Sequence, residues 1–281
     1  MPDAQYDSKD APDELFYVSR NAGCPGSTII FLHGLGSSQH EFADVVAVLE
    51  KDHHILAVDL PRHGGSASVG LDKPFTLSLA ASYVSSIIRK YAHDGCAHVV
   101  GLSTGGFVTL KLVEEHPDIV KSVWITGAAP FEGSRVWFAK RPGLYFYLED
   151  LARRVPSPLV DAYLSWQGIK MDDELRHVPV SNRKETYREV FASILEITDS
   201  VIKDVGSKGK RILTVAGGKH DDVASTRKTG QILRESGSPD SLAAVVRKAV
   251  HPWDLQFPDL FAASVKAWIN GSALPKEFEI L

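Results

Sequence analysis

Short and nearly uninterrupted apolar runs alternate with longer amphipathic stretches over much of the chain. In the longer stretches apolar residues recur at helical spacing, as Leu77, Tyr83 and Ile87 do. Apolar runs without a polar face are typical of strands that are covered on both sides. Strands that alternate with helices predict an α/β fold with a doubly wound, mostly parallel sheet. We expect strands at 15–20, 27–32, 54–59, 97–102, 120–127, 211–216 and 243–249, and helices at 38–50, 76–91, 105–115, 225–236 and 257–270.

This alternation stops between Phe131 and Lys208, where no strand pattern is found. Helical patterns near 144–154, 158–167, 184–196 and 198–205 occupy the stretch instead. The sequence therefore predicts a sheet domain formed by residues 1–130 and 209–281, with residues 131–208 inserted as a helical cap. With right-handed crossovers the carboxyl ends of parallel strands share one edge, where such folds bind ligands. A cap over this edge would shape the binding cavity.

The composition excludes several functional classes. Of the 281 residues, 44% are hydrophobic and 23% are charged, as in an ordinary globular protein. A net charge of −4 argues against a nucleic-acid binder. Cys24 and Cys96 are too few for a disulfide framework or a cysteine-based zinc site. No apolar run reaches the ~18 residues that a membrane helix needs, and the polar start lacks a secretion signal. We therefore expect a cytoplasmic protein without a membrane span. Its oligomeric state stays open, and a homodimer is one possibility.

The pattern Gly-x-Ser-x-Gly occurs at residues 101–105, between an expected strand and an expected helix. A serine at a sharp strand-to-helix turn needs small neighbours, because a Cβ atom on either side would collide as the chain turns back. This turn would raise the Ser103 hydroxyl above the sheet edge. It would also place the backbone N–H of Thr104 at a helix N-terminus, where it can stabilise an oxyanion. Ser103 is thus the candidate nucleophile, and a plain glycine-rich connection is the alternative.

A second glycine-containing loop, HGLGSS at residues 33–38, follows the expected strand at 27–32. In a hydrolase the backbone N–H groups of this loop, that of Leu35 foremost, would complete an oxyanion hole with Thr104. Gly34-Leu35-Gly36 could also be the start of a dinucleotide-binding fingerprint, in which Asp59 would be the acid that binds the ribose. The third glycine of that fingerprint falls on Gln39, however, which disfavours a nucleotide-dependent oxidoreductase.

Together these motifs resemble those of α/β-hydrolases of the serine type that carry a helical cap. Members typically combine an HG-x-G loop after an early strand, a D-x-P-x-HG-x-S loop and the serine turn. Here the three motifs are HGLGSS at 33–38, DLPRHGGS at 59–66 and GLSTGG at 101–106. The resemblance covers nearly the whole chain outside the cap. One departure is Arg62, which stands where the family usually has glycine.

The resemblance implies a catalytic triad in the chain order Ser, Asp or Glu, His. The family's acid follows a glycine by three positions after the strand at 211–216, which points to Asp221, with Asp222 as the fallback or as a helix cap. The family's histidine lies between the last strand and the last helix, at His251. This histidine would take the proton of Ser103 while Asp221 orients its ring. A metal site built from His220, Asp221 and Asp222 is disfavoured, because adjacent residues rarely converge on one ion.

We therefore expect hydrolysis of an ester or a lactone through an acyl-enzyme, without a metal or an organic cofactor. The small net charge favours a small, apolar substrate over a polyanion. Aromatic residues of the cap would pack together and in part line the cavity, the candidates being Trp137, Tyr145, Tyr163 and Trp166. Relatives with the same triad also cleave carbon–carbon bonds. A lyase, a cyclase or a ligand receptor would use the same fold without an acyl-enzyme, and these alternatives stay open.

Overall fold

The sheet has a parallel centre and antiparallel strands at both edges. In the computed structural model, which describes residues 4–6 and 14–281, the strand order is β1-β2-β4-β3-β5-β6-β7-β8-β9. Neighbouring strands from β4 to β8 in this order are parallel, whereas β1, β2 and β9 pair in antiparallel fashion. The predicted fold class is thereby confirmed. The strands are β1 (Ala4–Tyr6), β2 (Tyr17–Arg20), β3 (Thr28–Leu32), β4 (His54–Val58), β5 (Ala97–Leu102), β6 (Val120–Thr126), β7 (Ile212–Gly217), β8 (Leu242–Val246) and β9 (Glu279–Ile280).

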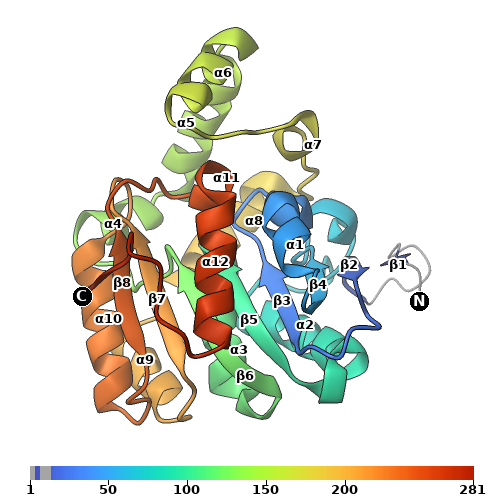
Figure 1. Ribbon diagram of the computed structural model, residues 1–281. Coiled ribbons are helices and arrows are strands. Elements are labelled where there is room, and N and C mark those ends of the chain that lie inside the picture. The colour runs from blue at the N-terminus through green and yellow to red at the C-terminus, as the bar shows by residue number, and fades with distance from the viewer. Residues whose placement is uncertain (1–3, 7–13) are drawn as a thin grey trace.

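Helices cover both faces of this sheet (Figure 1). On β3, Ile30 and Leu32 enter one hydrophobic core and Ile29 and Phe31 enter the other, which explains why these four consecutive residues are apolar. Helices α1 and α12 pack together on one side, and α2, α3, α9 and α10 follow one another on the other side. Their bounds are α1 (Ala43–Leu49), α2 (Leu77–Tyr91), α3 (Thr104–Glu115), α9 (Asp199–Gly206), α10 (Val223–Glu235) and α12 (Pro258–Ile269), and the short turns are η2 (Gln39–Phe42), η3 (Gly64–Ser66), η4 (His93–Gly95), η5 (Pro117–Ile119) and α11 (Trp253–Gln256).

The chain between β6 and β7 is helical. We call its first five helices the helical segment: α4 (Ser134–Ala139), α5 (Pro142–Arg153), α6 (Ser157–Trp166), α7 (Asp173–Arg176) and α8 (Arg183–Ile194). Figure 1 shows α5 and α6 projecting beyond the sheet domain, whereas α8 lies close to it. Helix α8 contacts α2, α3 and α5, and α9 packs on α3 and α10. The predicted cap, 131–208, thus includes a helix that packs with those covering the sheet, and the division into domains stays a prediction.

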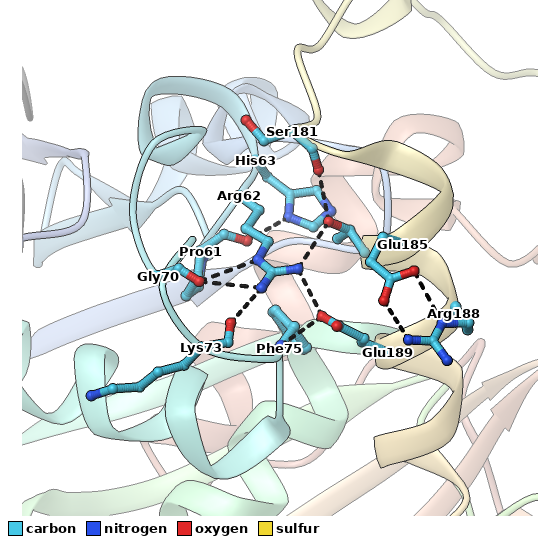
Figure 2. A network of polar contacts seen from close by, with 11 residues as sticks. Pro61, Arg62, His63, Gly70, Lys73, Phe75, Ser181, Glu185, Arg188 and Glu189 are labelled. Carbon is cyan, nitrogen blue, oxygen red and sulfur yellow. Dashed lines mark hydrogen bonds and ion pairs between the residues drawn. The ribbon is translucent and has the colours of Figure 1, made fainter.

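Arg62 joins the helical segment to the sheet domain (Figure 2). Its φ of 69° lies in the left-handed region that favours glycine, the residue expected there from the resemblance. The buried guanidinium donates to the carboxylate of Glu189 on α8 at 2.7 Å and to the backbone oxygens of Gly70 and Lys73. Glu189 also accepts the N–H of Phe75 at 2.7 Å. These bonds compensate for the strained backbone and tie the loop after β4 to α8.

Some elements differ from the sequence-based expectation. Strand β8 ends at Val246 instead of residue 249, because the following residues turn back toward β7, where Lys219 donates its N–H to the oxygen of Ala249. His251 therefore lies in a loop. Helices α4, α7 and α11 were not expected, since one or two turns are too short to establish a periodicity. Among residues 4–6 and 14–281, none of the helices combines the length and the apolar character needed to cross a membrane.

Candidate active site

Ser103 occupies the sharp turn between β5 and α3. Its backbone has φ 52° and ψ −117°, which is a strained conformation for a residue with a side chain. Packing leaves no room beside it, because a Cβ atom on Gly105 would lie 2.0 Å from the backbone oxygen of Leu32. The Ser103 N–H donates to Thr126 on β6 at 2.9 Å, and that of Gly105 donates to His33 at 3.0 Å. The turn is thus held by neighbouring strands, and the serine lies at the sheet edge.

Asp221 and His251 are brought together from the loops after β7 and β8. Oδ1 of Asp221 lies 2.5 Å from Nδ1 of His251, and Oδ2 accepts the N–H of Gly217 at 2.7 Å. Asp222 instead caps α10, where its side chain accepts the N–H of Ser225 at 3.0 Å. Because Asp221 engages Nδ1, the other ring nitrogen, Nε2, is the one left to accept a proton.

Neighbouring negative charges favour a positively charged His251, and the packing around its ring leaves little space. Burial by itself lowers the pKa of the ring, but the hydrogen bond and charge of Asp221, with the charge of Glu41, prevail and raise it. Gly127 borders the same ring: a Cβ atom there would lie 2.5 Å from Cε1 of His251, and its φ is 65°. Only glycine therefore fits beside the imidazole in this conformation.

Near Ser103, two backbone N–H groups have no hydrogen-bond partner among the described residues, whereas the N–H groups next to them in the chain do. The N–H of Gly34 donates to Oε2 of Glu41 at 3.0 Å, and that of Gly105 to His33. The N–H group of Leu35, which follows Gly34, and that of Thr104, which precedes Gly105, have no acceptor in the described part of the chain. Both residues line the same cavity as the serine. Free donors at a helix N-terminus and in an adjoining loop are suited to binding an oxyanion.

His33 holds this loop in place and does not act as a base. Its Nε2 accepts the N–H of Leu60 at 2.9 Å, so Nδ1 carries the proton and donates to the oxygen of Gly34 at 2.7 Å. Burial, together with the nearby His63 ring, lowers the pKa of His33 to about 3. The ring is therefore neutral and fixes the loop that carries Leu35.

The candidate residues surround a cavity of about 590 Å³ between the sheet edge and the helical segment. Of the four aromatic candidates, Trp137 and Tyr145 line it, whereas Tyr163 and Trp166 lie on α6 with 53% and 78% of their surface exposed. Neither ring is part of the cavity wall, and Figure 1 shows that helix α6 projects away from the sheet. Sequence reasoning missed most of the apolar wall, because its residues have the composition of ordinary core. These are Phe107, Phe131, Phe138, Phe191 and Ile194.

The loop that carries His251 is held by two further side chains. Gln256 accepts the N–H of Val250 at 3.0 Å and donates to the backbone oxygen of Gln167, after α6, at 2.7 Å. Trp253 donates from its ring N–H to the hydroxyl of Thr126 at 2.9 Å. No pattern in the sequence marks these residues, since their role depends on contacts distant along the chain.

Two buried carboxyl groups lie behind this site. Glu41 is 8% exposed and Asp254 is 1% exposed, and neither carboxyl oxygen of Asp254 has a hydrogen-bond partner among the described residues. Burial raises the pKa of Asp254 well above its usual range, and the charge of Glu41 raises it further. Glu41 also has a raised pKa through burial, but the N–H of Gly34 favours its charged form. Burial and the charge of Glu41 thus both favour the neutral form of Asp254, whereas the N–H of Gly34 opposes the effect of burial on Glu41.

The site shows no arrangement for a metal ion. Among the side chains that the structure describes, no three of His, Cys, Asp or Glu are placed to hold one. Asp221 is already engaged with His251, and Asp222 with the start of α10.

Comparisons with known proteins identify relatives of the whole chain. The chain is 27% identical over 276 residues to a Gibberella zeae protein described as an AB hydrolase superfamily protein, covering 95% of this chain and 88% of the relative. It is 26% identical over 259 residues to a pimeloyl-[acyl-carrier protein] methyl ester esterase of Neisseria meningitidis, covering 86% and 93%. The structure of the enol-lactonase from Burkholderia xenovorans is similar with a TM-score of 0.67 at 20% identity, covering 91% and 96%.

The family comparison covers most of the chain. The model of the Alpha/beta hydrolase family matches residues 29–268, a range that includes the turn at Ser103 and the loops of Asp221 and His251. The chain therefore belongs to the alpha/beta hydrolase family.

Proposed function

We propose that this protein is a serine hydrolase that cleaves the ester or lactone bond of a small, largely apolar substrate. Ser103 is the nucleophile, His251 is the base, and Asp221 orients the histidine. The proposal depends chiefly on one observation: Ser103, the paired His251 and the unoccupied N–H groups of Leu35 and Thr104 all border one cavity.

In the proposed cycle, His251 takes the hydroxyl proton of Ser103 as the serine oxygen attacks the substrate carbonyl. The N–H groups of Leu35 and Thr104 bind the negative oxygen of the tetrahedral intermediate. Its collapse breaks the bond to the leaving alcohol, which receives the proton from His251. Water then gives a proton to His251 and attacks the acyl-enzyme, and a second collapse releases the acid and restores the serine.

The choice of ester and lactone chemistry has two supports. The cavity wall is mostly aromatic and aliphatic, which suits an apolar acyl group. The names of the relatives, a methyl ester esterase and an enol-lactonase, describe the same bond types in those proteins.

A fluorophosphonate probe tests the covalent mechanism, because it labels only an activated serine. We expect labelling of the wild type and of Ser134→Ala, whose serine lies in the cavity wall, but none of Ser103→Ala. A parallel screen of aryl esters and lactones should show hydrolysis that disappears in Ser103→Ala. An unlabelled wild type, or a Ser103→Ala variant as active as the wild type, would refute the proposal.

A further inference from the structure

Arg135, at the start of α4, is a cation in the wall of an otherwise largely apolar cavity. It lines the cavity together with Ser103, His251 and the aromatic residues of the helical segment. Among the described residues of this wall it is the one side chain with a permanent positive charge. A charged group in such surroundings has lost part of its hydration, which makes an anionic partner favourable.

The guanidinium of Arg135 is only partly engaged by the protein. One nitrogen donates to the backbone oxygen of His220 at 3.0 Å. Among the side chains that the structure describes, no carboxylate lies within ion-pair distance of it. Of the two acids that follow His220, Asp221 is held by His251 and Gly217, and Asp222 caps α10. Since a guanidinium has five N–H donors, most of them have no protein acceptor.

The position of Arg135 relates it to the reaction centre. It is anchored at His220, next to the acid of the proposed triad, and its charge acts on His251. A substrate bound at Ser103 would therefore extend along the apolar wall and present part of its surface to this cation.

We infer that the substrate carries a carboxylate, which Arg135 binds through charge-assisted hydrogen bonds while the ester or lactone carbonyl lies at Ser103. This inference rests on the proposed serine-hydrolase function. It changes the expected substrate from a neutral apolar compound to a mostly apolar monoanion, such as the half-ester of a dicarboxylic acid. Arg135 would then determine specificity without taking part in the bond cleavage.

Matched pairs of esters test this inference. Each pair contains the monomethyl ester of a linear dicarboxylic acid, from succinate to suberate, and the methyl ester of the corresponding monocarboxylic acid. We expect the wild type to prefer at least one half-ester over its neutral counterpart. Arg135→Met should lower kcat/KM for that half-ester, relative to kcat/KM for its neutral counterpart, about 10- to 100-fold, mainly through the KM of the half-ester. Arg135→Lys should keep part of the preference.

Lys140→Met is the matched control, because it removes an exposed positive charge just after α4. Its preference should equal that of the wild type. Equal use of both members of every pair, with no effect of Arg135→Met on their ratio, would overturn the inference while leaving the serine mechanism intact. A wild type that is neither labelled by the probe nor active on any ester would instead refute the proposed function itself.

A second measurement decides the case in which the probe labels Ser103 but no ester of the series is hydrolysed. The free dicarboxylates should then slow the labelling of the wild type and of Lys140→Met, but not that of Arg135→Met. Equal protection of all three proteins, or no protection of any, would overturn the inference.

Discussion

The sheet edge that carries Ser103 and the helical segment border the same cavity, but they are built differently. At the edge, Asp221 has both carboxyl oxygens engaged, and the serine turn is held by bonds from two strands. In the segment, large apolar side chains on α5 and α6 face solvent, among them Tyr147, Leu159 and Trp166. Hydrogen bonds therefore fix the side chains and the turn at the sheet edge in one arrangement, whereas most of the helical segment has few contacts that fix its position. We expect catalysis to depend on the edge and substrate choice to depend on the segment.

The largest expected effect is at the edge. Asp221→Asn should lower kcat on the order of 10³- to 10⁴-fold, because an amide cannot hold the His251 tautomer and does not stabilise the imidazolium. Asp222→Asn is the matched control: asparagine caps a helix as well as aspartate does, so activity should change by less than about 3-fold. The measurement is the steady-state hydrolysis of an aryl ester. Similar losses in the two variants would contradict the assignment of Asp221.

A stability measurement tests where the segment is firmly attached. Glu189→Gln should lower the free energy of unfolding by about 3 kcal/mol, because it leaves the buried Arg62 without its counter-ion. Glu185→Gln removes a carboxylate one turn away that pairs with Arg188 on the exposed surface, so urea unfolding should scarcely change. Figure 2 shows both pairs side by side. Equal behaviour of the two variants would mean that α8 is not anchored through Arg62.

Substitutions of two glycines with positive φ distinguish a loss of activity caused by backbone strain from one caused by contact with His251. Gly127→Ala and Gly133→Ala should each cost about 1–2 kcal/mol of stability, since φ is 65° and 53°. Only at Gly127 would the new methyl group meet the His251 ring, while nothing lies within 4 Å at Gly133. Activity should therefore fall about 100-fold in Gly127→Ala and stay unchanged in Gly133→Ala. An equal loss in both would show that strain alone is responsible.

The smallest expected effect concerns pH. His251 must be neutral to accept a proton, so kcat/KM should rise with pH through its pKa, which is raised above 6.5. Glu41→Gln removes a negative charge that supports the imidazolium, so this rise should move to lower pH. Asp44→Asn removes an exposed charge and should leave the profile in place. A Glu41→Gln profile that coincides with that of the wild type would exclude this role.

The features that could be predicted are those recorded locally in the sequence. The strands at 27–32 and 97–102 carry apolar residues on both faces because both faces are covered. The glycines beside Ser103 are required because the turn leaves no space for a Cβ atom. Asp221 and His251 were expected from the resemblance to the family; the structure pairs their side chains, and their catalytic roles stay a prediction. Glu41 and Asp254 could not be predicted, because a buried acid and an exposed one look alike in a sequence. Likewise, the sequence could not separate Trp137 from Trp166, since that difference depends on how far α6 projects.

The bonds of Arg62 have a consequence for how such a protein can diversify. They fix α8 to the loop after β4, and β6 is fixed within the sheet, so α4 to α7 connect two stationary points. A connection of this kind tolerates insertion, deletion or replacement better than an element of the sheet does. Recombination between Lys140 and Asn182 would therefore exchange α5, α6 and α7 as one cassette, leaving both Arg135 and the proposed catalytic residues in place.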